Sequence, residues 1–209
     1  MKKVSASFLS CKDVVLGLKK LNETDVDFIH VDIMDGKFVK NKTMPFREMR
    51  NIYKYTSKRL DVHLMVSDPS KYIPLYAELN TEYITFHIES LGDIEENLKL
   101  IKKYSIKAGL AIKPDTSVNT LIPYLPYLDL ILVMSVEPGE GGQAFIEECG
   151  AKVSEVSTLL KEYNSQALIN VDGGINNITK DFCDKADILT AGSYIVNSDN
   201  YQEKVTSLR

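Results

Sequence analysis

The chain has 209 residues, 44% of them hydrophobic and 26% charged, and carries a formal net charge of −4. A chain of this size can bury a full core, and no change of composition marks a linker, so we expect a single domain over residues 1–209. Acidic and basic residues are interspersed and form no stripe. This pattern argues against nucleic acid and against a membrane surface as partners.

The three cysteines, Cys11, Cys149 and Cys183, are far apart and form no CxxC pair. The sequence therefore predicts neither a disulfide framework nor a cysteine zinc site, and it favours a reducing, cytoplasmic location. No apolar run is long enough to cross a bilayer. The first apolar stretch is short and contains Ser5 and Ser7, so we expect a buried strand there rather than a signal sequence.

Short β-rich apolar segments alternate with charged stretches of helical spacing, and we count eight such pairs. The expected strands are Val4–Phe8, Phe28–Ile33, Leu60–Val66, Tyr83–Ile88, Ala108–Ile112, Leu128–Val136, Ala167–Val171 and Ile188–Ala191. The expected helices include Asp13–Leu21, Pro69–Leu79, Asp93–Tyr104 and Gly150–Tyr163, and Asp93 with Glu96 resembles a capping pair. Strict alternation implies parallel strands with right-handed crossovers, and eight units can close into an α/β fold, the (β/α)8 TIM barrel.

An open, doubly wound sheet is the rival fold, because alternation alone does not distinguish a closed sheet from an open one. That fold usually places a glycine-rich phosphate turn after its first strand, and Val4–Leu9 contains no glycine. The polar residues favour the barrel. All three histidines, His30, His63 and His87, fall toward the carboxyl ends of expected strands, which together form the active-site face of a barrel.

Four residues at strand ends predict a site for a divalent metal ion. His30 and Asp32 are two residues apart and so point to the same face of one strand. His63 lies near the end of the next strand, and Asp172 ends the seventh. One such residue alone is more often a hydrogen-bonded core or turn residue, but two imidazoles and two carboxylates together suit zinc, iron, manganese or cobalt. His87 is expected to support a ligand or to pack, rather than to bind the ion.

Glycines after the last three strands predict a phosphate site at the same face. They are Gly139, Gly141 and Gly142 after the sixth strand, Gly173 and Gly174 after the seventh, and Gly192 with Ser193 after the eighth. Each group alone is explained by a tight turn, but backbone amides gathered at one rim can bind an anion. Met34, Met65 and Met134 also recur at strand ends, where we expect a dry wall beside the metal.

Several stretches, spread over nearly the whole chain, match one known family. They are Ser7, His30–Val39, His63–Val66, Gly109–Thr116, Val133–Gly139 and Val171–Ile175. On these stretches the chain resembles the ribulose-phosphate 3-epimerases, which interconvert the ketose phosphates D-ribulose 5-phosphate and D-xylulose 5-phosphate.

The resemblance implies a role for each of the matching residues. The implied metal ligands are His30, Asp32, His63 and Asp172, and the implied acid and base are Asp32 and Asp172. The implied substrate and phosphate contacts are Ser7, His63, Gly139, Glu140, Gly141, Gly142, Asp172, Gly173, Gly174, Gly192 and Ser193.

The chemistry of epimerisation explains these residue types. Removing the weakly acidic proton next to a ketone requires a base on one face and stabilisation of the enediolate that forms. A divalent ion can stabilise the enediolate as a Lewis acid. Inversion then requires an acid on the opposite face. Asp32 and Asp172 can exchange these roles with the direction of the reaction, and their titrations are expected to be coupled.

Two departures from the family leave the substrate open. Glu140 stands where the family commonly has an aromatic residue, and Lys40 stands where it tends to have proline, before the unusual loop Asn41–Phe46. Epimerisation of allulose 6-phosphate therefore stays an alternative. A lyase similar to hexulose-phosphate synthase is disfavoured by the two histidines and paired aspartates. A non-catalytic sugar-phosphate binder ranks last, because all four site residues are present. Homo-oligomerisation also stays open.

Overall fold

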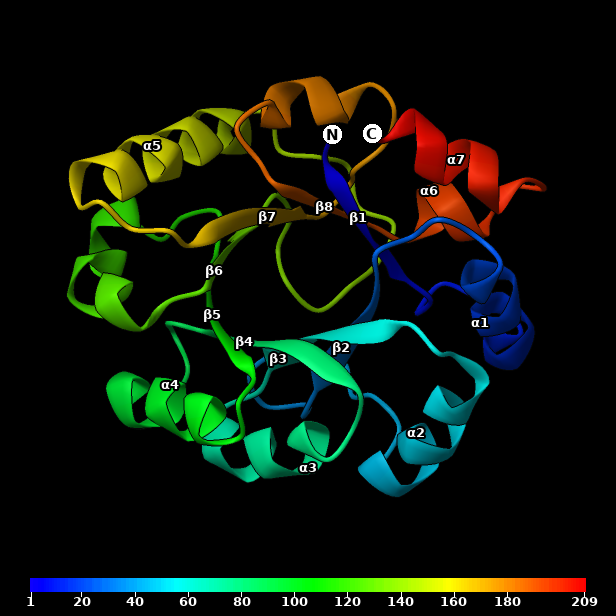
Figure 1. Ribbon diagram of the computed structural model, residues 1–209, viewed down its shortest axis with the longest axis horizontal. Coiled ribbons are helices and arrows are strands. Elements are labelled where there is room, and N and C mark those ends of the chain that lie inside the picture. The colour runs from blue at the N-terminus through cyan, green and yellow to red at the C-terminus, as the bar shows by residue number, and fades with distance from the viewer.

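Eight parallel strands close into a barrel in chain order, with β8 paired to β1. The computed structural model describes all residues, 1–209. Helices surround the barrel (Figure 1). The strands are β1 (Lys3–Ser7), β2 (Phe28–Met34), β3 (Arg59–Met65), β4 (Thr81–His87), β5 (Lys107–Ile112), β6 (Leu130–Met134), β7 (Leu168–Asp172) and β8 (Ile188–Ala191). All eight predicted strands are confirmed, with ends that differ by up to two residues.

The crossovers between strands are less regular than the sequence predicts. The α-helices are α1 (Val14–Asn22), α2 (Phe46–Ile52), α3 (Ile73–Ala77), α4 (Ile94–Lys103), α5 (Glu148–Glu162), α6 (Ser193–Val196) and α7 (Tyr201–Ser207). Four 3-10 helices, η1 (Tyr53–Tyr55), η2 (Pro69–Lys71), η3 (Val118–Tyr127) and η4 (Thr179–Cys183), supplement or replace them. None of these helices combines the length and the apolar composition that crossing a membrane requires.

Prolines explain where the observed helices depart from the expected ones. The helix expected over Pro69–Leu79 is two pieces, η2 and α3. Pro74 lies at the start of α3, and in a continuous helix its ring would clash with the carbonyl four residues earlier. Between β5 and β6, η3 contains Pro123 and Pro126. The expected cap of α4 is confirmed, because the Asp93 carboxylate accepts a hydrogen bond from the Glu96 backbone N–H at 3.0 Å.

Alternate residues of each strand point into the barrel and form layers. Phe28, Tyr83, Leu130 and Ile188 make a small apolar cluster that fills the amino-terminal end of the barrel. Outward-facing residues pack under the helices in the main core, so the strands are buried on both faces, as expected. Above this cluster, Ala111, Leu132, Met134 and Val136 keep the β5 and β6 side apolar, whereas buried polar residues of β1 to β4, β7 and β8 fill the rest of the interior. The chemistry therefore lies toward the carboxyl ends of the strands.

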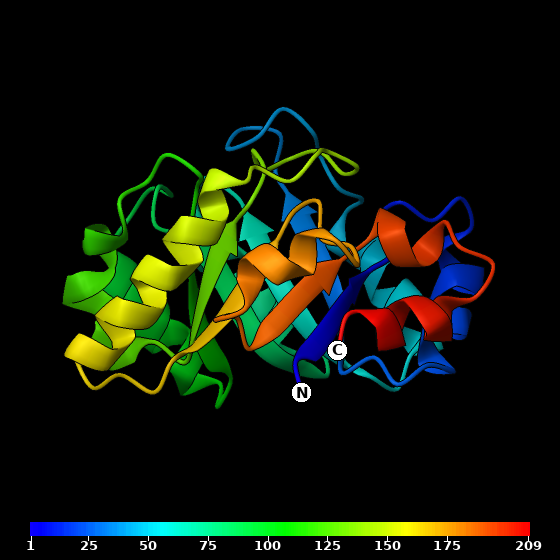
Figure 2. The ribbon, with the colours of Figure 1, turned by 90° about the horizontal axis from the view of Figure 1, so that it is seen from above.

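Two loops rise over that end of the barrel. Figure 2 shows the strand arrows pointing to one side, where the segments that follow β2 (blue) and β6 (yellow-green) lie above the mouth. The Asn41 side-chain amide donates a hydrogen bond to the Gly139 carbonyl oxygen at 2.7 Å. A side chain on Gly139 would collide with Val39, 2.7 Å from its Cβ position. The β2 and β6 loops therefore pack closely against each other.

Candidate active site

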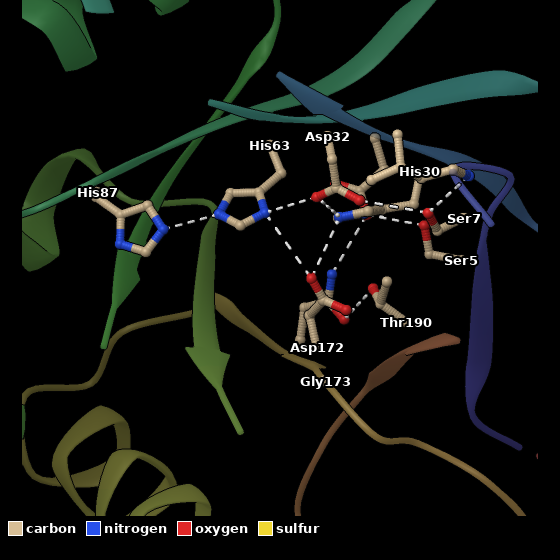
Figure 3. Close-up of polar contacts among 12 residues, drawn as sticks. Ser5, Ser7, His30, Asp32, His63, His87, Asp172, Gly173 and Thr190 are labelled. Atoms are coloured by element: carbon tan, nitrogen blue, oxygen red, sulfur yellow. Dashed lines mark hydrogen bonds and ion pairs between the residues drawn. The ribbon is translucent and has the colours of Figure 1, made fainter. Parts of the chain in front are cut away.

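Strand register brings the predicted metal ligands together. In the β2 and β3 pair, Asp32 lies opposite His63, and His30 lies opposite Asp61. Asp172 ends β7, and its side chain points toward His30 and His63 (Figure 3). Because β2 and β3 are neighbours while β7 belongs to the other half of the barrel, only closure of the sheet places Asp172 beside them.

The four donor atoms alternate nitrogen and oxygen around a ring. His30 Nε2 lies 3.2 Å from Asp32 Oδ1 and 3.5 Å from Asp172 Oδ2. His63 Nδ1 lies 3.1 Å from Asp32 Oδ1 and 3.8 Å from Asp172 Oδ2. Donors bonded to one ion at about 2.1 Å are separated by roughly 3.4 Å in a tetrahedron. The residues present therefore fit a divalent cation, as the sequence predicts.

The electrostatics of this ring favour positive charge. Burial by itself lowers the pKa of His30, but the carboxylates of Asp32, Asp61 and Asp172 outweigh it and hold that pKa well above the usual value. Burial acts to raise the pKa of Asp32, whereas His30 and His63 hold it far below the usual value. The ring therefore stabilises a proton or a cation between its carboxylates, which a cation site requires.

A second polar layer lies directly beneath the ring, and the sequence analysis missed it. The Asp61 carboxylate accepts hydrogen bonds from Ser5 Oγ at 2.8 Å and Asn170 Nδ2 at 3.3 Å, and it pairs with His30 Nδ1 at 2.9 Å. Thr190 Oγ1 donates to Asn170 Oδ1 at 3.0 Å. Each member stands two residues before a predicted site residue, so the same strand periodicity could have revealed the layer.

His87 contacts the ring from outside it. Its Nε2 lies 2.9 Å from His63 Nε2, and its Nδ1 lies 3.1 Å from Glu89 Oε2. Burial lowers the pKa of His87 to about 4. Burial acts to raise the pKa of Glu89, but hydrogen bonds from His87, Thr116 and the Lys113 backbone lower it to about 2. His87 is thus a neutral hydrogen-bond partner of His63, which is one of the predicted ligands.

The glycine turns and the aspartates line one pocket at the mouth. Its walls include Ser7, Asp32, Met34, Met65, Met134, Gly139, Glu140, Gly141, Gly142, Asp172, Gly173, Gly174, Gly192 and Ser193. The three methionines thus form part of the wall, as expected. His30 and His63 are buried behind the aspartates and do not line the pocket. The contact of His63 with substrate therefore stays a prediction.

Two of these glycines have conformations that other residues avoid. Gly173 has φ of 121°, and a Cβ there would lie 2.5 Å from Val136 Cγ2. Gly174 has φ of 63°, and its Cβ would collide with the Phe145 backbone. The backbone N–H groups of Gly173, Gly174 and Gly192 donate to no protein group. These backbone N–H groups lie at one rim of the pocket and can therefore donate hydrogen bonds to an anion.

Asp35 organises the turn that follows β2. Its Oδ1 accepts hydrogen bonds from the backbone N–H groups of Lys37 and Phe38, and its Oδ2 accepts from the Ser67 N–H and hydroxyl. Partial burial opposes ionisation, but these bonds lower the pKa of Asp35 to about 2. Because this folded-state pKa is below that of the unfolded chain, Asp35 stabilises the fold above about pH 4. That stability is lost as the pH falls toward 2.

We expect Asp35→Asn to lower the free energy of unfolding by about 1 kcal/mol at pH 7, since solvent screens part of the interaction. The amide would present N–H groups to the Ser67 N–H. Urea unfolding at pH 7 and pH 3 checks this, with the exposed Asp199→Asn as control. The difference between wild type and Asp35→Asn should shrink at the lower pH, and a difference that grows there would contradict the assignment.

Comparisons with known proteins agree with this geometry. The family described as "Ribulose-phosphate 3 epimerase family" matches residues 3–196. The chain is 35% identical to a ribulose-phosphate 3-epimerase of Bacillus subtilis (strain 168), covering 100% of this chain and 99% of the relative. It is 39% identical to a ribulose-phosphate 3-epimerase of Buchnera aphidicola, covering 99% and 93%.

Solved structures show the same fold at lower identity. A 3-hexulose-6-phosphate synthase from Salmonella typhimurium superposes with a TM-score of 0.65 at 17% identity, covering 99% of this chain and 96% of that one. An N-(5'-phosphoribosyl)anthranilate isomerase from Pyrococcus furiosus gives a TM-score of 0.62 at 14% identity, covering 100% and 96%. At such identities the likeness concerns the barrel alone.

Proposed function

Because the chain belongs to the ribulose-phosphate 3-epimerase family, an enzyme family, we propose that it interconverts D-ribulose 5-phosphate and D-xylulose 5-phosphate by inverting carbon 3. The observation that carries this proposal is the pair of aspartates, Asp32 and Asp172. They reach the pocket from separate parts of the barrel and share the ring with two histidines. Inversion needs such a pair, since one group must remove a proton from one face while another delivers a proton to the other.

Each aspartate has one oxygen in the ring and one left for proton transfer. Asp32 faces the histidines with Oδ1, while its Oδ2 accepts a hydrogen bond from Ser7 Oγ at 3.3 Å. Asp172 faces them with Oδ2, so its Oδ1 is the outer atom. We assign proton transfer at carbon 3 to Asp32 Oδ2 and Asp172 Oδ1. One is ionised and the other protonated before each turnover, and the reverse reaction exchanges them.

His30, Asp32, His63 and Asp172 would hold a divalent ion in this mechanism. When bound, the ion supplies positive charge that stabilises the negative charge developing on the substrate oxygens. Two nitrogen and two oxygen donors suit zinc, iron, manganese or cobalt. Asp61 keeps the His30 ring oriented by accepting from Nδ1–H, as a carboxylate commonly does behind a ligating histidine.

The glycine rim gives the substrate phosphate its place. Gly173, Gly174 and Gly192 follow β7 and β8, next to Asp172, so their free amides would fix the phosphate at one end of the pocket. The sugar then extends toward the aspartates. Met34, Met65 and Met134 would exclude water from the reacting carbon, which strengthens the charge interactions there.

Solvent exchange tests both the reaction and the substrate. The metal-loaded enzyme is incubated with D-ribulose 5-phosphate in deuterated water and followed by NMR, with allulose 6-phosphate in parallel. We expect D-xylulose 5-phosphate with deuterium at carbon 3. Exchange with the hexose phosphate alone would keep the mechanism and change the substrate. Exchange with neither substrate would contradict the proposal and support a non-catalytic binder.

Glu140 gives a separate prediction about the phosphate. Its side chain is exposed at the pocket, and Gln143 Nε2 donates to its carbonyl oxygen at 2.8 Å, which ties the turn together. Because a carboxylate repels a phosphate, Glu140→Phe should lower KM more than it changes kcat. An exposed charge of this kind corresponds to about 0.5–1 kcal/mol, or a two- to fivefold effect. Steady-state kinetics at low salt measure it.

Two further variants separate charge from shape at this position. Glu140→Gln should reproduce most of the fall in KM, since it removes the charge while keeping the side-chain length. Glu147→Gln, an exposed position that does not line the pocket, should leave KM unchanged. A larger effect on kcat than on KM in Glu140→Phe would contradict a role for Glu140 beside the phosphate.

A further inference from the structure

His63 uses its two ring nitrogens in opposite directions. Nδ1 faces the ring, 3.1 Å from Asp32 Oδ1, whereas Nε2 lies 2.9 Å from Nε2 of His87 (Figure 3). A hydrogen bond between two imidazole nitrogens contains one proton, so one histidine donates and the other accepts. A neutral imidazole carries a proton on only one nitrogen. The direction of this bond therefore decides whether Nδ1 of His63 has a lone pair to offer a cation.

Glu89 determines that direction. Its Oε1 accepts a hydrogen bond from the Lys113 backbone N–H at 3.0 Å and another from the Thr116 hydroxyl, and its Oε2 lies 3.1 Å from Nδ1 of His87. An ionised carboxylate can only accept, so Nδ1 of His87 carries the proton. With a cation in the ring, Nδ1 of His63 would bind the ion instead of donating a proton to Asp32. Nε2 of neutral, buried His87 is then the acceptor, and Nε2 of His63 is the donor.

We propose that Glu89 and His87 are positioning residues that keep the proton of His63 on Nε2, so that Nδ1 is the atom presented to the cation. This inference rests on the proposed function, because it assumes a cation in the ring. Neither Glu89 nor His87 lines the pocket. Their effect on the reaction would therefore pass through His63 and not through contact with substrate.

Packing holds His87 in place for this role. Its ring lies against that of Phe38, with 4.9 Å between centroids, and Lys113 Nζ is 4.6 Å from the Phe38 centroid. His87 is 0% exposed. Its two ring nitrogens form hydrogen bonds with His63 and with Glu89. His30 differs, because its Nδ1 meets the carboxylate of Asp61 directly.

The decisive variant is Glu89→Gln, which has the same shape and reverses the bond. Two donors hold the position of Oε1, so the amide oxygen belongs there and the NH2 group faces His87. His87 would then accept at Nδ1 and donate from Nε2, which moves the proton of His63 to Nδ1. We expect the affinity for Zn²⁺ to fall by about 10- to 100-fold, the range seen when support of a ligand is lost.

The affinity is measured on metal-free protein by competition with a chromophoric chelator. Glu82→Gln is the matched control, because Glu82 lies on β4 but is bonded to Arg59 and Lys107, and this variant should bind Zn²⁺ like wild type. Long-range ¹H–¹⁵N NMR of zinc-loaded wild type should show the protons on Nδ1 of His87 and on Nε2 of His63. A proton on Nε2 of His87, or wild-type affinity in Glu89→Gln, would overturn the inference.

A second pair of variants separates this role from packing. His87→Gln can accept from His63 with its amide oxygen and should retain most of the Zn²⁺ affinity, whereas His87→Leu cannot and should lose it. Equal losses in both, with both folded by circular dichroism, would overturn the inference. Wild type that binds no Zn²⁺ would instead refute the cation site of the proposed function. Wild-type binding with an unaffected Glu89→Gln refutes the positioning role alone.

Discussion

Asp172→Asn is expected to reduce kcat by about 10³-fold or more while leaving the protein folded, since loss of a general acid or base typically costs 10²- to 10⁴-fold. Asparagine has nearly the shape of aspartate, and the Asp172 side chain, which is 18% exposed, lies at the pocket wall rather than in the core. The asparagine amide can neither accept nor release a proton near neutral pH, so it cannot act as an acid or a base. One face of the substrate then lacks its acid or base.

Deuterium exchange distinguishes loss of a base from general damage to the site. With Asp32 intact, Asp172→Asn should incorporate deuterium into no more than one of the two epimers, because Asp32 reaches only one face. Asp32→Asn should show the complementary preference. Metal content is measured for each variant, and the exposed Asp199→Asn serves as control. Substantial epimerisation by Asp172→Asn would exclude the two-aspartate mechanism.

Removal of the metal is expected to have the second large effect. Dialysis against a chelator should lower activity by about 10²-fold or more, since the charge that stabilises the developing oxyanion is lost. Adding back zinc, iron(II), manganese(II) or cobalt(II) separately should restore activity with at least one ion and show which the ring prefers. Full activity in protein shown to contain no metal would contradict the assignment. Chelator already saturated with zinc is the control.

Binding of the metal ion should also stabilise the folded protein. A ligand that binds only the folded protein stabilises it by about 2.7 kcal/mol at one hundred times its Kd. Thermal unfolding should therefore occur at higher temperature with the ion than without it. The gain should disappear in His63→Ala, which removes one donor of the ring, and should persist in Glu82→Gln. An ion that raised the unfolding temperature equally in His63→Ala would be bound elsewhere.

Local patterns were sufficient to predict the strands and the residues of the ring. The spacing of His30 and Asp32 fixes both side chains on one face of β2, whatever surrounds that strand. The helices were predicted less well, because short helices such as α2 and α6 depend on packing against the barrel rather than on their own periodicity. The position of Pro74 within the expected Pro69–Leu79 helix could have predicted, from the sequence alone, that this helix is interrupted.

The partners of the ring were harder to predict, since they come from neighbouring strands. Asp61 meets His30 because the β2 and β3 register sets them opposite each other, and a shift of one residue would turn Asp61 away. His87 meets His63 although their Cα atoms are not paired across β3 and β4, where His63 lies opposite Thr85. Contacts of this kind depend on side-chain direction and barrel curvature, which no single strand encodes.

The sequence by itself determined the alternation of strands and helices, the residue types of the site and their order along the chain. These follow from side-chain periodicity and from the few residue types that bind cations and transfer protons. Only the tertiary structure decided that Asp172 of β7 closes the ring with β2 and β3, that Phe38 covers His87, and that Glu89 stands behind it. Barrel closure and register set those distances, and both result from the packing of all eight strands together.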